Sequence, residues 1–295
     1  MVNNLLPRLM TAMVTPFKTN LEVDFEKAGQ LAQYLIENGS QGLVVCGTTG
    51  ESPTLSKEEK VQLFRSVKDK VGKEIPVWAG IGSNSTDQSV QLAKKAVDAG
   101  VDGIMAVTPY YNKPSQEGLY RHFKAIAESV SLPLMLYNVP SRTSINMLPE
   151  TVKRLSGIDN IVCLKESTGN MDQMSELKSM VPSDFIIYCG DDALTLPMMS
   201  LGAHGVVSIA SHLIGNDILQ MIDSYINGQI QKAQQIHARL FPVFKVLFVT
   251  TNPIPIKEAL KMRGQDKGLL REPLCEASEG EKESIARVLR DLGLI

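Results

Sequence analysis

A lysine interrupts an apolar run of the chain, at IVCLKESTGN (161–170). The residues before it are typical of a buried strand. Lys165 comes directly after them, ahead of the first turn residue. A buried ammonium group without a partner is costly, so such a lysine snorkels to solvent, forms an ion pair or loses its proton. A lysine amine that is removed from water and neutral can attack a ketone and form an imine.

Residues that could line a reactive site also follow several of the other apolar runs. They are Thr48 and Thr49 in GTTGES, Tyr110 and Tyr111, Tyr137 and Asn138 with Arg142 after them, Gly190 with Asp191 and Asp192, and Val207 with Ser208. In imine chemistry a tyrosine can move protons on and off the intermediates. Threonine hydroxyls in a glycine-rich turn suit the carboxylate of a ketoacid, and an arginine offers a bidentate clamp for a second carboxylate.

Each of these residues also has an ordinary structural interpretation. Taken alone, Lys165 is more often a snorkelling residue at a strand end, and Tyr111 and Tyr137 are more often packed aromatic rings. GTTGES alone is a strand-to-helix turn, and Arg142 alone is a loop arginine in water. The sequence indicates an imine-forming enzyme only if the fold brings these residues to one rim.

Eight short apolar runs alternate with segments of helical periodicity, and these elements must position the reactive residues. The expected strands span 9–17, 42–47, 76–82, 103–109, 133–140, 161–168, 185–192 and 205–211. Strands that alternate with helices form a parallel sheet, and eight such units close a barrel whose active site lies at the carboxyl ends of the strands. We therefore predict an α/β fold, a (β/α)8 TIM barrel over residues 1–229, with a C-terminal helical extension of three helices over 230–295.

An open, doubly wound sheet is the competing arrangement. It normally carries a glycine fingerprint after its first strand, whereas AGIGSNS (79–85) lacks the G-x-G-x-x-G spacing and follows the third. A dinucleotide site is therefore not expected. In the barrel, alternation along a strand puts Lys165 on one face with Cys163, and Tyr137 on one face with Met135.

Composition and charge argue against several classes of protein. The chain has 295 residues, of which 43% are hydrophobic and 21% are charged, as in an ordinary globular protein. A net charge of −2 gives no reason to expect nucleic acid or an anionic membrane as a partner. No membrane-spanning run and no signal-peptide pattern is present, and the scattered cysteines and histidines predict neither disulfides nor a metal site. We expect a cytoplasmic protein.

Six blocks of the chain resemble the dihydrodipicolinate synthase family, which belongs to the pyruvate-dependent class I aldolases. They are GTTGESPTL, TPYYNKPSQEGLYRHF, YNVPSRT, CLKESTGN, GDDALTLPMMSLGAHGVVS and NPIPIKEAL. The blocks follow the family's order and spacing over nearly the full length. The resemblance implies condensation of pyruvate with L-aspartate 4-semialdehyde, toward diaminopimelate and lysine. It also implies that no cofactor is needed and that the protein is a homo-oligomer, usually a dimer of dimers.

The resemblance implies four catalytic residues. Lys165 matches the family's Schiff-base lysine, and Tyr137 matches its general acid and base. Thr48 and Tyr111 match the proton-relay partners of that tyrosine. In the family, the residue at the position of Tyr111 reaches into the site of the neighbouring subunit.

The resemblance also implies the substrate-binding residues. Thr49 and Val207 match positions that contact pyruvate, and Gly190 is predicted to bind substrate beside them. Arg142 matches the arginine that holds the carboxylate of the semialdehyde. Lyases acting on sugar acids resemble GSTGE at the first motif, where this chain has GTTGE. Another pyruvate aldolase or lyase of the same fold, and a non-catalytic ketoacid-binding barrel, are the alternatives.

The chain departs from the family at one place. Members inhibited by lysine carry a histidine and a glutamate in a separate site between subunits, and the matching residues here are Lys57 and Gln88, beside Asn84 and Tyr110. A cation in place of histidine and an amide in place of the acid disfavour the amino group of bound lysine. We therefore predict weak or absent inhibition by lysine.

Overall fold

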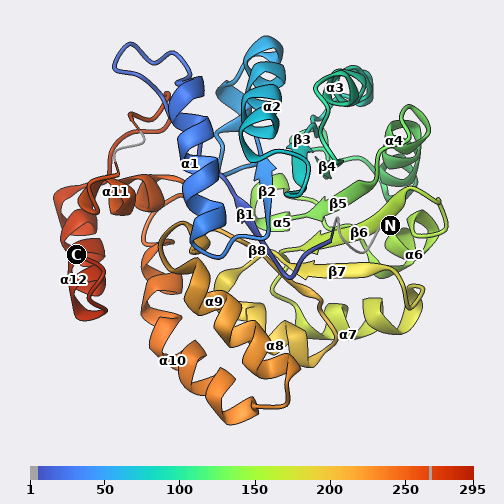
Figure 1. The fold of residues 1–295 in the computed structure, drawn as a ribbon. Coiled ribbons are helices and arrows are strands. Elements are labelled where there is room, and N and C mark those ends of the chain that lie inside the picture. Colours follow the sequence, from blue (N-terminus) through green and yellow to red (C-terminus); the bar gives the residue numbers. More distant parts are fainter. Residues whose placement is uncertain (1–5, 266–267) are drawn as a thin grey trace.

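The computed structural model describes residues 6–265 and 268–295, so five residues of the predicted barrel segment and two of the C-terminal segment lie outside it. Across the described residues, eight parallel strands close into a barrel in chain order, with β8 paired to β1 (Figure 1). The strands are β1 (Leu9–Ala12), β2 (Gly42–Val45), β3 (Val77–Gly80), β4 (Gly103–Val107), β5 (Leu134–Asn138), β6 (Ile161–Glu166), β7 (Ile186–Cys189) and β8 (Gly205–Ser208). Each lies within the run that predicted it. The (β/α)8 barrel is thereby confirmed, and the open sheet is ruled out.

Every strand is shorter than its apolar run, because the last residues of each run turn out of the sheet at the rim. After β2, for example, Cys46 has a φ of 56° and Glu51 a φ of 54°. Such left-handed backbone is uncommon for residues other than glycine, and it converts the segment between them into a tight turn. The predicted rim residues therefore lie mostly on turns that the barrel holds at its mouth.

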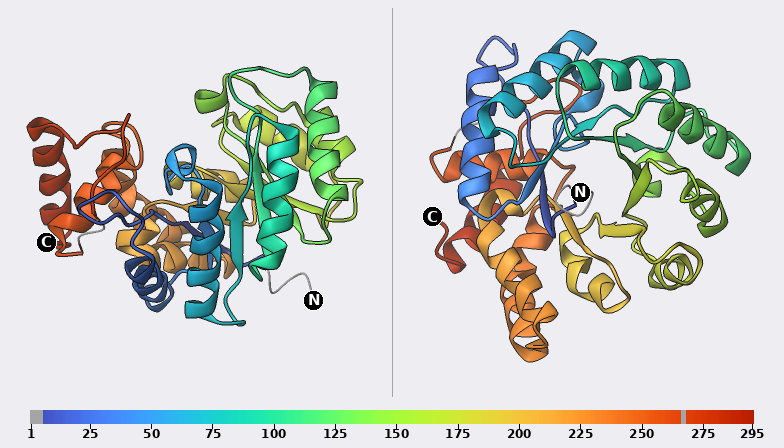
Figure 2. Two further views of the ribbon diagram at one scale, coloured as in Figure 1. Left: turned by 90° about the horizontal axis from the view of Figure 1, so that it is seen from above. Right: turned by 45° about the vertical axis from the view of Figure 1, so that its right-hand side comes forward.

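Helices surround the barrel between successive strands (Figures 1 and 2). They are α1 (Phe25–Glu37), α2 (Lys57–Val71), α3 (Thr86–Asp98), α4 (Gln116–Glu128), α5 (Pro140–Thr143), α6 (Pro149–Leu155), α7 (Met171–Met180), α8 (Thr195–Ser200) and α9 (Ser211–Ile226). Helix α2 begins with a capping box, in which Ser56 and Glu59 each bond the other's backbone N–H. The single turn α5 was not predicted, since it is too short to show a helical period.

Three further helices follow in the described part of the chain, as predicted. They are α10 (Ile230–Val246), α11 (Ile254–Met262) and α12 (Glu279–Asp291). Helix α10 packs on α9, and both views in Figure 2 place the red α11 and α12 on the side of the barrel where α1 lies. None of the helices in the described residues is long and apolar enough to span a membrane.

Two apolar layers hold the fold together. The larger lies between the strands and the helices, and the smaller fills the barrel interior with side chains that include Met135, Tyr137 and Cys163. The indole of Trp78 fits this interior because Gly103 on the next strand lacks a side chain; a Cβ there would lie 2.6 Å from the ring. The interior face is therefore the one that alternation predicted for Tyr137 and Lys165.

Candidate active site

Lys165 lies near the end of β6, where the strand register sets it between Tyr137 on β5 and Tyr188 on β7. It is 5% exposed, and its Nζ lies 4.4 Å from the centre of the Tyr137 ring. Within the part of the chain that the structure describes, no carboxylate forms an ion pair with this amine. The buried lysine therefore neither snorkels nor pairs with an acid, which leaves its amine available to react.

Two adjoining cavities meet at the mouth of the barrel. The smaller, of about 90 Å³, is lined by Lys165 together with residues of several strand ends, including Thr49 and Gly190. The larger, of about 660 Å³, opens beside it. Thr48, Tyr137 and Arg142 line both cavities, so these three predicted residues are brought to the same rim as the lysine.

The turn after β2 presents its threonines to the lysine from across the barrel. Its backbone is closed by a hydrogen bond from the N–H of Glu51 to the carbonyl of Thr48, and Thr15 donates its hydroxyl to the carbonyl of Gly50 at 2.7 Å. The hydroxyl of Thr49 is buried and accepts a hydrogen bond from Nδ2 of Asn252 at 3.0 Å. The turn is therefore held by the barrel on one side and by a distant segment on the other.

Gly190 gives the lysine side chain its space. A Cβ at this position would lie 3.0 Å from Cε of Lys165 and would overlap the hydroxyl of Ser167. A larger residue would therefore push the lysine or the serine out of place. The N–H of Gly190 donates to the carbonyl of Glu166 at 2.8 Å, which ties β7 to the strand that carries the lysine.

Two buried carboxyl groups form hydrogen bonds that link neighbouring strand ends at the rim. Burial raises the pKa of Glu166, which accepts hydrogen bonds from Thr168 N at 2.7 Å and from Nδ2 of Asn138 at 3.1 Å. Burial likewise raises the pKa of Asp192, which accepts bonds from the hydroxyl of Ser208 and from the backbone at the start of α9. These acids hold strand ends together and do not face the lysine.

Two predicted site residues lie elsewhere. Tyr111 is 89% exposed, on a loop where its φ is 72°, and it lines neither cavity in this chain. Val207 is buried deeper, in the barrel interior, and Ile209, two residues further along, lines the small cavity instead. The roles assigned to Tyr111 and Val207 therefore stay predictions.

Six residues that line the small cavity were not among the strand-end residues predicted from the sequence. They are Val139, Ser141, Ser167, Ile209, Phe248 and Asn252. For Ser167 a signal was available, because alternation places it on the same face as Lys165. Asn252 comes from the C-terminal extension, and the only signal was its place in the block NPIPIKEAL.

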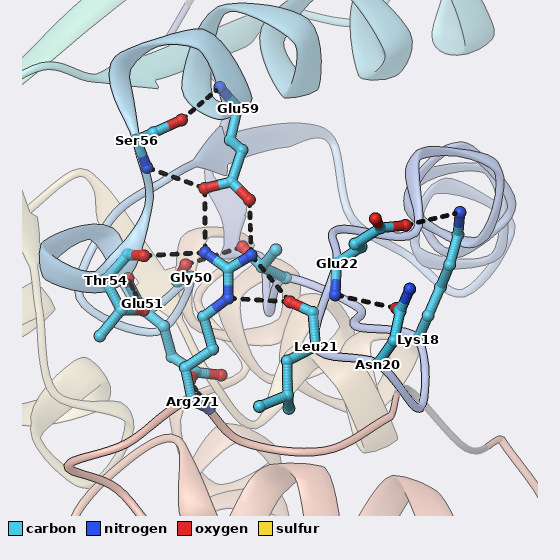
Figure 3. Close-up of polar contacts among 11 residues, drawn as sticks. Lys18, Asn20, Leu21, Glu22, Gly50, Glu51, Thr54, Ser56, Glu59 and Arg271 are labelled. Atoms are coloured by element: carbon cyan, nitrogen blue, oxygen red, sulfur yellow. Dashed lines mark hydrogen bonds and ion pairs between the residues drawn. The ribbon is translucent and has the colours of Figure 1, made fainter.

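A buried ion pair joins the turn after β2 to the C-terminal extension. Nζ of Lys257 on α11 lies 2.6 Å from Oε1 of Glu51, and the two side chains are 4% and 0% exposed. The second oxygen of Glu51 accepts the backbone N–H of Arg271 at 3.0 Å. Figure 3 shows the guanidinium of Arg271 donating in turn to Glu59 and to the carbonyl of Thr54. An ion pair and hydrogen bonds therefore hold the C-terminal extension against the segment that carries Thr48 and Thr49.

The larger cavity contains the residues predicted to weaken inhibition by lysine. Lys57, Gln88 and Tyr110 line it, and Lys60 adds a second cation. Nζ of Lys57 donates to Oε1 of Gln91 at 3.2 Å, and burial lowers the pKa of Lys60. The lining of this cavity is thus rich in cations and amides.

Comparisons with known proteins match nearly the whole chain. The model of the dihydrodipicolinate synthetase family matches residues 5–292. A 4-hydroxy-tetrahydrodipicolinate synthase from Desulforudis audaxviator is 54% identical, over 98% of this chain and 98% of the relative. A solved dihydrodipicolinate synthase from Bacillus anthracis has a TM-score of 0.94 and 51% identity, covering 96% of this chain and 97% of that one. One from Cyanidioschyzon merolae, solved with lysine bound, has a TM-score of 0.96 and 46% identity over 98% of both chains.

Proposed function

The chain belongs to the dihydrodipicolinate synthetase family, and from that premise we propose that it condenses pyruvate with L-aspartate 4-semialdehyde through an imine on Lys165. Family membership makes it a synthase of the lyase class, a 4-hydroxy-tetrahydrodipicolinate synthase of lysine and diaminopimelate biosynthesis that acts on small-molecule substrates. The observation that carries the proposal is the buried amine of Lys165, which faces Tyr137 at the cavity and has no carboxylate paired with it in the described residues.

The proposed reaction starts with attack of the neutral lysine amine on the ketone carbon of pyruvate. The carbinolamine loses its hydroxyl as water, and the imine then loses a proton from the methyl group to give an enamine. The electron pair of the enamine forms the new bond to the aldehyde carbon of the second substrate. The amino group of that substrate then displaces Lys165 from the imine carbon, which closes a ring and frees the enzyme.

The other rim residues have roles that follow from these steps. Tyr137 lies against the lysine and carries protons to and from the leaving groups, with Thr48 as a relay. The buried hydroxyl of Thr49 faces the pyruvate carboxylate, and Gly190 leaves room for the adduct. Arg142 binds the carboxylate of the semialdehyde as a bidentate clamp. No cofactor takes part in this scheme.

We also propose that the active protein is a homo-oligomer, a dimer of dimers in the cytoplasm. The large exposure of Tyr111 supports this, because a ring that lines neither cavity of its own chain can complete the relay only in a partner subunit.

Borohydride trapping tests the proposed function directly. Treating the protein with pyruvate and sodium borohydride should reduce the imine to a stable amine, so peptide mass mapping should find a pyruvyl adduct on Lys165. Omission of pyruvate is the first control. The peptides of Lys68 and Lys257, which form ion pairs, are the second and should stay unmodified. An unmodified Lys165 would rule out every imine mechanism.

Lysine is expected to inhibit the enzyme weakly or not at all. Its ammonium group would enter a cavity that already holds Lys57 and Lys60 and offers an amide at Gln88, so the charges repel. Initial rates over a range of lysine concentrations measure this. The matched variant, with Lys57→His and Gln88→Glu together, should be inhibited more strongly. Half-inhibition of the unaltered enzyme at submillimolar lysine would contradict the prediction.

A further inference from the structure

We propose that Asn252 is a substrate-contact residue that recognises the α-ammonium group of the aldehyde substrate; this inference rests on the proposed function. Asn252 directly precedes the segment that forms α11, yet it lines the small cavity with Lys165. The residue as a whole is only 3% exposed. Polar side-chain atoms buried this deeply normally have hydrogen-bond partners, so each polar atom of Asn252 can be checked for one.

The side-chain amide of Asn252 is held in one orientation. Its Nδ2 donates to the hydroxyl of Thr49 at 3.0 Å, while its backbone carbonyl accepts a bond from Nη2 of Arg142 at 3.4 Å. The residue therefore touches both the predicted pyruvate contact and the predicted carboxylate clamp. No other residue in the described part of the chain forms hydrogen bonds with both Thr49 and Arg142.

The remaining amide atom, Oδ1, has no hydrogen-bond partner among the described residues. An acceptor that is buried and unpaired costs free energy, so a ligand that supplies a donor is favoured at this point of the cavity. Pyruvate supplies none, since its carboxylate and ketone only accept hydrogen bonds. Of the two substrates, only the semialdehyde brings a hydrogen-bond donor into the cavity.

The α-ammonium group of L-aspartate 4-semialdehyde is such a donor. In an amino acid the ammonium and carboxylate groups share one carbon, so a carboxylate bound by Arg142 brings the ammonium near whatever is bonded to that guanidinium. Here Nη2 of Arg142 is bonded to the backbone carbonyl of Asn252, so the side chain that carries Oδ1 belongs to the residue next to the predicted clamp. Asp191 lines the same cavity and adds a carboxyl group to this side of it. The arrangement offers a cation for the carboxylate and oxygen acceptors for the ammonium.

The consequence is selectivity for an amino-acid aldehyde over the same aldehyde without the amino group. A site built to bond a polar group discriminates strongly against an analogue that lacks it, because the protein partner is then left unpaired. The competing aldehyde is 4-oxobutanoate, which keeps the chain length and the carboxylate. The enzyme should bind it much more weakly than the natural substrate.

Substitution of Asn252 tests the inference with two aldehydes. For N252L, kcat/KM for the semialdehyde should fall about 10- to 100-fold, as for a lost bond to a charged group. The inhibition constant of 4-oxobutanoate should change less than that. Trapping of pyruvate on Lys165 by borohydride should persist. The conservative variant N252D keeps an acceptor oxygen and should keep the preference for the amino-bearing aldehyde.

The outcomes separate the inference from the function. If the unaltered enzyme fails to turn over the semialdehyde, the proposed function fails and the inference with it. If the unaltered enzyme is active but N252L weakens both aldehydes equally, Asn252 only supports the structure and the inference alone is wrong. Loss of the preference in N252D, or its retention in N252L, would also overturn it. Thermal unfolding of each variant identifies any that fail to fold. If N252L does not fold, the aldehyde preference of N252D tests the inference.

Discussion

Replacement of Lys165 by alanine is expected to lower kcat/KM by about 10⁴-fold or more, the scale of losses when a covalent nucleophile is removed. The side chain supplies the only atom that joins pyruvate to the protein in the proposed scheme. The neighbouring phenol of Tyr137 can move protons, but it cannot form an imine. Steady-state rates with saturating pyruvate and a varied semialdehyde concentration measure the loss.

The fold should survive this change. Lys165 pairs with no carboxylate in the described residues, so its removal leaves no buried charge without a partner, and the truncation leaves a cavity that adjoins an existing one. The matched variant Lys165→Arg keeps a long side chain but replaces the amine by a guanidinium, which is not a nucleophile, and should be equally inactive. Circular dichroism shows whether both variants remain folded. Activity of either folded variant above one hundredth of normal would contradict the assignment.

The second large effect is expected at the buried ion pair between Lys257 and Glu51. Replacing Lys257 by methionine leaves the carboxylate of Glu51 buried without its cation, a change that costs about 3–5 kcal/mol of folding free energy. The same change should lower activity, since Glu51 closes the turn that carries Thr48 and Thr49. Denaturant unfolding and kcat measured on the folded fraction report the two effects separately.

Two further variants isolate the cause. The double variant Glu51→Gln with Lys257→Met removes both charges, so it should recover much of the lost stability. The pair of Lys68 and Asp102 has a similar separation of 2.6 Å but is 12% and 20% exposed. Lys68→Met should therefore cost only about 1 kcal/mol. Equal losses in Lys68→Met and Lys257→Met, or no gain in the double variant, would show that burial of the charge is not the cause.

The barrel and half of the rim could be predicted because their signals are local. Each strand is an apolar run, and alternation along a strand decides which side chain faces the interior, so Lys165 and Tyr137 could be paired before the fold was known. Gly190 followed from its place at a strand end. These residues lie on elements whose order and direction a parallel barrel dictates.

The contacts made by the C-terminal extension depend instead on packing between segments that are far apart in the chain. Asn252 meets Thr49 across 203 positions, and Arg271 meets Glu51 across 220. No period or motif specifies which side of a barrel a C-terminal extension will cover, so these contacts could not be predicted from spacing. The role assigned to Tyr111 also could not be derived from spacing within one chain, since it depends on a second copy of the chain.

The long reach of these contacts has a consequence for how the enzyme is made. The turn with Thr48 and Thr49 is synthesised early. Asn252, Lys257 and Arg271 lie near the C-terminal end of the chain and are synthesised late. Until they arrive, Glu51 has no cation and Thr49 lacks its amide partner. A chain cut short before Asn252 would therefore lack both the amide that bonds Thr49 and the cation that pairs with Glu51.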